Sequence, residues 1–178
     1  MSDTRTPFLQ GALDWIYNSD PPATCPECGY RWDIPYADAC ELIRSSPDRF
    51  EEALVGKDGM VPQDDNSWNA TAYLWHLTDL ARSWSERWHQ IEADPGSRLV
   101  GWDPDELAEV RGYRSLPTTP GLWALREAVE DLMESTEAVG RAAQFIHGDW
   151  SEGNVSDAMV WLGHEFHHHE QDVRQRAV

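Results

Sequence analysis

The stretch that decides the fold is residues 155–173, VSDAMVWLGHEFHHHEQDV. At about 100° per residue, its apolar side chains fall on one side of a helix, with Leu162 at the centre of that side. His169 lies about 20° from Leu162, and Glu165 lies about 60° from it in the same direction. The sequence therefore predicts a helix that directs a carboxylate and an imidazole, one turn apart, towards the protein interior.

Within the same stretch, His164, Glu165 and His168 match H-E-x-x-H, the pattern of zinc-dependent proteases with two histidine ligands and a glutamate base. His164 and His168 lie about 160° and 120° from the centre of the apolar side, so they point away from the core. The H-x-x-G-x-x-H continuation that would supply a third ligand does not follow. We therefore interpret His164, His167 and His168 as solvated surface residues, with His168 open to a contact with a substrate or partner.

A second predicted helix, residues 68–91, carries a histidine on its apolar side. His76 lies about 40° from Leu80, inside the apolar stripe of that helix. A lone histidine in such a stripe is more often a hydrogen-bonded core residue than a metal ligand. A buried carboxylate without a cation is costly, however, so we predict that His76, Glu165 and His169 together hold one divalent metal ion. Zinc is the first candidate, and nickel, iron or manganese would also accept two imidazoles and a carboxylate.

Two further long helical segments and one shorter candidate complete an all-α pattern. Residues 36–54 show helical periodicity, which Ser46-Pro47 splits because these residues are typical of a cap and a first-turn proline. Residues 119–139 repeat apolar side chains at helical spacing, and residues 103–110 form a shorter candidate helix with Asp103 as its cap. No alternating run is long enough to indicate a sheet. The pattern predicts a four-helix bundle.

The bundle is expected to occupy residues 36–178 and to follow an N-terminal arm, residues 1–35, which contains Cys25-Pro26-Glu27-Cys28-Gly29. Three cysteines without an export signal indicate reduced thiols or metal ligands rather than disulfides. The Cys-x-x-Cys turn is also half of a zinc-binding knuckle. Three interpretations stay open: free thiols, a redox pair, and a metal site completed by Cys40 or by a partner chain.

Composition excludes several classes of partner. The 32 acidic and 14 Lys or Arg residues give a net charge of -18, which repels nucleic-acid phosphates and anionic membrane surfaces. No signal peptide and no apolar stretch of about 18 residues occurs, so we expect a cytoplasmic protein that acts on a small molecule. Ten tryptophans in 178 residues are a high count and predict a partly wet apolar wall, either in a core or in a pocket.

Both ligand helices resemble motifs of the DinB-like superfamily, the metal-binding four-helix bundles of the DinB/YfiT type that include bacillithiol transferases and mycothiol-dependent maleylpyruvate isomerase. Residues 164–173 resemble the closing motif of that family, in a register that selects His169 as a ligand. Glu165 resembles the residue that the mycothiol isomerase type has at the ligand position four residues earlier. Residues 68–80 resemble the second-helix motif, which supplies His76 as the remaining ligand. The cysteine turn is similar to a segment that precedes the bundle in one branch of the family.

The resemblance implies an S-transferase or isomerase that uses a low-molecular-weight thiol, such as mycothiol or bacillithiol, on a small electrophile. Three protein ligands leave a fourth coordination position open, as in catalytic metal sites. A second hypothesis is a non-catalytic metal-binding or interaction protein, in which the ion joins two helices. A metal-dependent hydrolase is a third, and a homodimer also stays open.

Four residues near the predicted ligands are candidates for supporting roles. Asp172 or Asp79 is expected to orient a ligand imidazole through a hydrogen bond. Arg87 and Ser83 lie on the His76 side of their helix and are candidates to face a substrate. The plainer interpretation of Arg87 is a solvated surface side chain.

Overall fold

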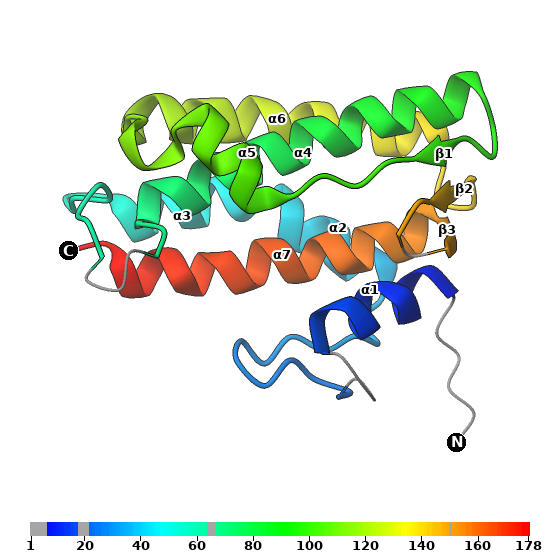
Figure 1. Ribbon diagram of the computed structural model, residues 1–178, viewed down its shortest axis with the longest axis horizontal. Coiled ribbons are helices and arrows are strands. Elements are labelled where there is room, and N and C mark those ends of the chain that lie inside the picture. Colours follow the sequence, from blue (N-terminus) through cyan, green and yellow to red (C-terminus); the bar gives the residue numbers. More distant parts are fainter. Residues whose placement is uncertain (1–6, 18–21, 64–66, 150) are drawn as a thin grey trace.

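The computed structural model confirms the predicted four-helix bundle (Figure 1). It describes residues 7–17, 22–63, 67–149 and 151–178. The rods of the bundle are α2 (Tyr36–Arg44) continued by α3 (Ser46–Leu54), α4 (Ala70–Ala93), α6 (Thr118–Val139) and α7 (Val155–Arg176). Helices α4 and α6 pack against each other, α4 also packs against α7, and the α2–α3 rod contacts both α6 and α7. The four rods therefore enclose one core.

Side-chain caps fix where the two ligand-bearing helices begin. Asn69 accepts a hydrogen bond of 2.8 Å from a backbone N–H in the first turn of α4. Asn154 accepts one of 3.1 Å in the first turn of α7. Asp103, the predicted cap of α5 (Pro104–Arg111), accepts from two backbone N–H groups. These bonds satisfy donors that have no partner inside a helix, and so they hold the start of each helix in place.

Aromatic side chains fill the interior of the bundle. Trp84 and Trp88 on α4 are fully buried, with ring centroids 4.9 Å apart, and Phe50 and Phe166 are buried with them. Fully burying a large apolar side chain contributes roughly 1.5–3 kcal/mol, so this cluster is a major source of stability. The apolar stripes predicted for α4 and α7 face this core.

A small sheet corrects the expectation that the chain has no strands. Its strands are β1 (Arg98–Leu99), β2 (Gln144–His147) and β3 (Ser151–Asn154), in the order β1-β2-β3. β1 pairs with β2 in parallel, and β2 pairs with β3 in antiparallel register. Strands of two to four residues are too short to show the alternation by which a strand is recognised in a sequence. The sheet joins the end of α4 to the start of α7.

The N-terminal arm also contains a helix that the sequence did not predict, α1 (Pro7–Tyr17). It packs against β3 and α7, and Phe8 is fully buried there. A Cβ atom on Gly153 would lie 2.5 Å from the Phe8 Cβ, so only glycine permits this approach of helix and strand. After α1, residues 22–35 run beside α7 (Figure 1). The arm therefore packs against the bundle at both of its described segments.

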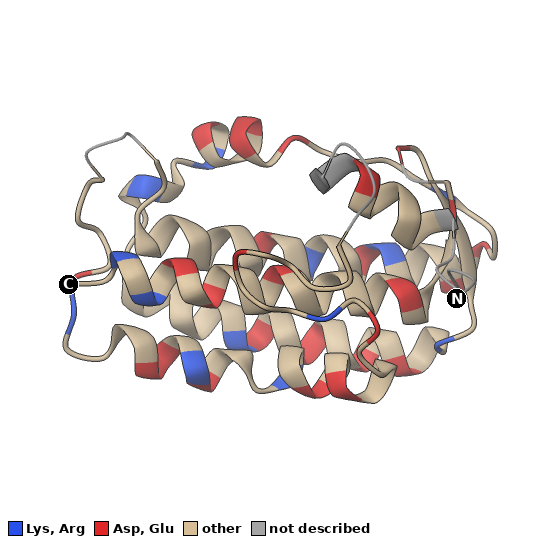
Figure 2. Cartoon of the chain, turned by 90° about the horizontal axis from the view of Figure 1, so that it is seen from below, with Lys and Arg blue, Asp and Glu red and all other residues tan. Residues whose placement is uncertain are grey.

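The acidic residues are spread over the helices rather than gathered in one place (Figure 2). Lys and Arg are fewer and lie between them, in keeping with the net charge of -18. Among the described residues, no helix combines the length and the apolar character that crossing a membrane requires.

Candidate metal centre

The structure brings together the three predicted ligands. His76 comes from α4, and Glu165 and His169 lie one turn apart on α7. One ligand atom from each lies within 4.8 Å of the others. The two imidazole rings meet edge to face with centroids 5.2 Å apart, and the His169 Nε2 lies 3.7 Å from a Glu165 oxygen. A divalent ion between them would have two nitrogen ligands and one oxygen ligand, a set that suits zinc and other transition metals.

Of the two residues expected to orient a ligand imidazole, Asp172 and Asp79, Asp172 is in position to do so. Its carboxylate lies 2.9 Å from the His169 Nδ1. A histidine that donates its Nδ1–H to a carboxylate presents Nε2 as the free ligand atom, on the side where Glu165 lies. Asp79, the other candidate, instead accepts hydrogen bonds from the Tyr113 hydroxyl at 2.7 Å and from Arg111 at 3.0 Å. It therefore holds the segment that follows α5, and the hydrogen bonds and ion pairs found for it among the described residues are with Arg82, Arg111 and Tyr113 rather than with a predicted ligand.

Burial and electrostatics keep two of the three residues, His76 and Glu165, in the forms that bind metals. Burial, together with the neighbouring charge of His169, lowers the pKa of His76 to about 3, so its imidazole is neutral at physiological pH. Burial alone would raise the pKa of Glu165, but a hydrogen bond from His164 and the nearby imidazoles bring it down to about 2. The His76 Nδ1 is buried and has no hydrogen-bond partner among the described residues. A neutral imidazole, an ionised carboxylate and an unpartnered buried nitrogen fit a metal ion.

A pocket of about 580 Å³ opens beside the three ligands. Aromatic side chains form much of its wall, and the polar groups away from the ligands are Arg87, Asp103, His147 and Asp149. Four of the ten tryptophans line it: Trp68, Trp84, Trp102 and Trp161. The predicted tryptophan wall is therefore in part the wall of a pocket.

Arg87 lines this pocket rather than extending into solvent. Its guanidinium lies 4.7 Å from the Trp84 ring centroid and donates a 2.6 Å hydrogen bond to the Val100 carbonyl. Burial lowers the pKa of Arg87 to about 10, so the side chain is charged at neutral pH. Ser83 has an indirect role, because it accepts a 3.2 Å hydrogen bond from the Trp102 indole. Arg87 is thus a fixed positive charge in an apolar pocket.

His147 is a pocket residue for which sequence reasoning had found no role. It belongs to β2, a strand too short to be recognised, so no periodic pattern marked it. Burial and the charge of Arg87 lower the pKa of His147 to about 4. Its ring is nearly parallel to that of Trp84, at a centroid distance of 6.4 Å. His147 therefore contributes a neutral polar group to the pocket.

The interpretation of His164 as a solvated residue was wrong. Only 4% of this residue is exposed, and its ring packs against Tyr30 of the arm. His168 lies on the same side, and the His167 Nε2 is 3.0 Å from the Cys28 carbonyl oxygen. The helical angles were correct, but residues 22–35 cover this side of α7 and their packing leaves no periodic signal.

Among solved structures, the chain is similar to YfiT from Bacillus subtilis, described as a probable metal-dependent hydrolase with an unusual four-helix bundle topology. The TM-score is 0.67 over 89% of this chain and 93% of YfiT, at 14% sequence identity. This chain has the YfiT-type fold. The fold expected from the DinB-like resemblance is thereby confirmed. No protein-family model matches the chain, and no curated protein matches it. At 14% identity the likeness to YfiT establishes the fold and leaves the activity to the site.

Proposed function

We propose that the chain is a metal-dependent enzyme that transfers a low-molecular-weight thiol of the mycothiol or bacillithiol type to a small electrophile. The observation that carries this proposal is the position of the three ligands at the wall of a pocket of about 580 Å³. Three protein ligands beside a ligand-sized space are the arrangement of a catalytic metal site, whereas a structural site has four ligands and no opening.

The roles of the surrounding residues follow from their positions. A divalent ion held by His76, Glu165 and His169 supplies Lewis acidity, which favours the deprotonated form of a thiol at neutral pH. Arg87 pairs with an anionic group of the substrate or thiol, because it is the fixed cation of the pocket lining. The tryptophan walls exclude water from the reacting atoms.

The reaction conserves atoms and charge without a redox partner. The thiol releases its proton to solvent, and its sulfur forms a bond with the electrophilic carbon. The bond from that carbon to the leaving group breaks, and the leaving group departs with the electron pair. An isomerase would use the same addition of sulfur and then release the thiol again.

Metal-dependent hydrolysis is the second candidate, and the comparison with YfiT favours it because that protein is described as a probable hydrolase. In the form that the structure supports, the hydrolase uses the same three ligands and the same pocket, with water in place of the thiol. The H-E-x-x-H form has no such support, because His164 and His168 lie with Cys25 and Cys28. The third candidate function is non-catalytic: the metal ion would only join α4 to α7.

The decisive experiment uses cobalt-substituted protein, which is titrated with mycothiol and bacillithiol in the presence of a panel of small electrophiles. We expect the visible cobalt bands to shift on addition of thiol and the electrophile to be consumed. His76→Ala should abolish both effects, whereas His89→Ala, at an exposed position on the same helix, should preserve them. Turnover of ester or amide substrates without any thiol would favour the hydrolase. If no thiol changes the spectrum and no substrate is turned over, the non-catalytic function, in which the ion only joins two helices, would be favoured.

A further inference from the structure

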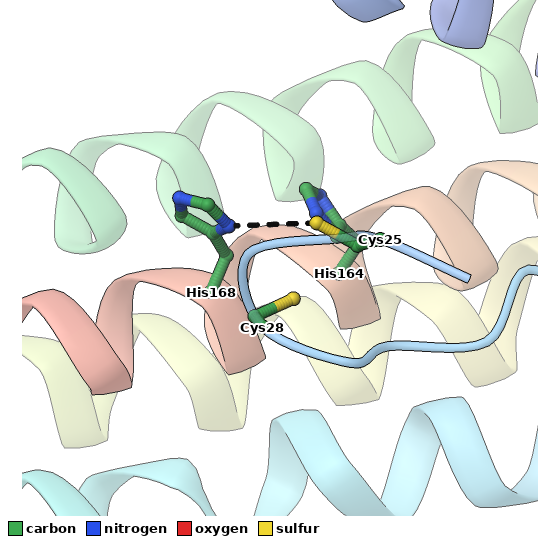
Figure 3. A group of neighbouring side chains, drawn as sticks. All are labelled: Cys25, Cys28, His164 and His168. Carbon is green, nitrogen blue, oxygen red and sulfur yellow. Dashed lines mark hydrogen bonds between the residues drawn. The ribbon is translucent and has the colours of Figure 1, made fainter. Parts of the chain in front are cut away.

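A second group of metal-binding side chains lies on a neighbouring side of α7, about 100° around the helix from Glu165 and His169. Cys25 and Cys28, from the turn of the arm, face His164 and His168, which are one turn apart on the helix (Figure 3). One ligand atom from each of the four lies within 4.8 Å of the others, and the Cys25 Sγ is 4.0 Å from the His168 Nδ1. Cys40, which had been considered as the completing ligand, is not in the group.

The backbone of the arm places both sulfur atoms on one side. The Cys25 N–H donates a 2.8 Å hydrogen bond to the Tyr30 carbonyl, and the Gly29 N–H donates one of 2.9 Å to the Cys25 carbonyl. Gly29 has a φ of 75°, a conformation that favours glycine because it has no Cβ. A hairpin bridge between Thr24 and Arg31 closes the turn. Main-chain bonds therefore hold this turn in the geometry that brings the two cysteines together.

Three of the four side chains are shielded from water, and one of these three has an unused nitrogen. Cys25, Cys28 and His164 are each less than a tenth exposed. The His164 Nδ1 lies 3.1 Å from a Glu165 oxygen, which leaves Nε2 as the atom available to a ligand. That Nε2 is buried and has no hydrogen-bond partner in the part of the chain that the structure describes. A buried imidazole nitrogen without a partner is costly, and a metal ion would satisfy it.

The surface of α7 is shaped to receive the arm. The Tyr30 hydroxyl donates a 2.6 Å hydrogen bond to the Val160 carbonyl, and the Gln171 side chain donates one of 3.0 Å to the Cys28 carbonyl. A Cβ atom on Gly163 would lie 2.7 Å from the Tyr30 oxygen, so the helix has a glycine where the arm comes closest. The Trp32 ring lies 4.4 Å from that of His164. These contacts hold the cysteines against the histidines.

We propose that Cys25, Cys28, His164 and His168 bind one divalent metal ion of the zinc type and that this ion fixes the arm to α7. Two thiolates and two imidazoles form a complete tetrahedral set, which leaves no position for a substrate and indicates a structural role. In such a set the ligand atoms lie about 3.3–3.8 Å apart, so small side-chain rotations would close the present group around an ion. The two thiol protons are released to solvent on binding, and no electron transfer is involved.

This site is separate from the His76 centre but is in contact with it. His164 and Glu165 are adjacent in sequence and belong to different ligand groups, and the 3.1 Å contact between them joins the two. When the arm site is filled, the His164 ring is fixed and its Nδ1–H is directed at the Glu165 carboxylate. The structural ion would therefore help to orient a ligand of the other centre.

The first test counts metal in the full-length protein, loaded with zinc or cobalt under reducing conditions. We expect two equivalents per chain, and with cobalt an intense near-ultraviolet band from thiolate ligation. Cys25→Ser combined with Cys28→Ser should leave one equivalent and remove that band, whereas Cys40→Ser should leave both unchanged. His76→Ala should also leave one equivalent but keep the thiolate band, so failure of this site and failure of the proposed catalytic site give different results.

A second measurement avoids dependence on folding of the variants. The zinc-loaded native chain is treated with an alkylating reagent before and after addition of a chelator, and the peptide with Cys25 and Cys28 is weighed by mass spectrometry. Protection that the chelator abolishes supports the site. Equal alkylation with and without the chelator, or a peptide two mass units lighter because of a Cys25–Cys28 disulfide, overturns it, as does a thiolate band that is absent from the native protein.

Discussion

Burial in the folded protein determines the pKa of His147, and nothing in the sequence around this residue indicates that burial. Its pKa falls from 6.5 to about 4 in the folded protein, because burial and Arg87 disfavour the imidazolium. Between these two pH values the unfolded chain binds a proton at this residue and the folded chain does not. The contribution of His147 to the free energy of unfolding is therefore fully present above pH 6.5 and is lost as the pH falls towards 4.

We therefore predict that the free energy of unfolding decreases between pH 6.5 and 4, with a contribution from His147 on the order of 3 kcal/mol. Urea unfolding at several pH values would measure it. His147→Gln should make the decrease shallower, while His89→Gln, on an exposed histidine, should follow the native profile. Equal slopes for His147→Gln and the native protein would contradict this assignment.

Among the structural elements, the packing of the arm against α7 depends on Gly163. An added methyl group would lie 2.7 Å from the Tyr30 oxygen, which must then move and lose its bond to the Val160 carbonyl. We predict that Gly163→Ala destabilises the arm by about 1–3 kcal/mol, although alanine by itself favours a helix. Limited proteolysis within residues 22–35 and thermal unfolding would detect it.

Tyr30→Phe provides the matched control, because it removes the oxygen that the methyl group would meet. The cost of Gly163→Ala should be smaller in the Tyr30→Phe protein than in the native one, and a double-mutant cycle measures the difference. If the effects of the two substitutions on stability are additive, contact with the Tyr30 hydroxyl is not the reason for a glycine at position 163.

The same packing explains which elements could be predicted from the sequence. The bundle helices carry regular apolar stripes, so their number and the inward direction of His76, Glu165 and His169 followed from periodicity. The break near Ser46 followed from the cap and first-turn proline at Ser46-Pro47. The arm and the sheet bury residues such as Phe8 and His147 through contacts between segments distant in sequence. Local spacing contains no record of such contacts, and so His164 was mistaken for a surface residue.

At the scale of the whole molecule, we expect the core of the bundle to fold without a metal ion, and the proposed ions to fix the arm and the ligand-bearing helices relative to one another. A ligand at a concentration 1,000 times its Kd stabilises a folded protein by about 4 kcal/mol, and each kcal/mol raises the Tm of a protein of this size by roughly 2–4 °C. We predict that a strong chelator lowers the Tm by about 10 °C while the helical circular dichroism at 25 °C is retained. In the protein with Cys25→Ser and Cys28→Ser, the chelator should lower the Tm by less than in the native protein, because one of the two proposed ions is already absent. Complete loss of helical signal on chelation would contradict a core that folds without metal.

The alternation of ligands along one helix has a consequence for insertions and deletions. Residues 164, 165, 168 and 169 belong to the two proposed metal sites, on two neighbouring sides of a single helix. Removing Phe166 alone would bring His169 to the helix position of His168 and Glu170 to that of His169, so both groups would keep a possible donor at these positions. Removing Phe166 and His167 together would instead bring Glu170 and Gln171 to those two positions, and we expect this two-residue deletion to weaken both proposed sites at once.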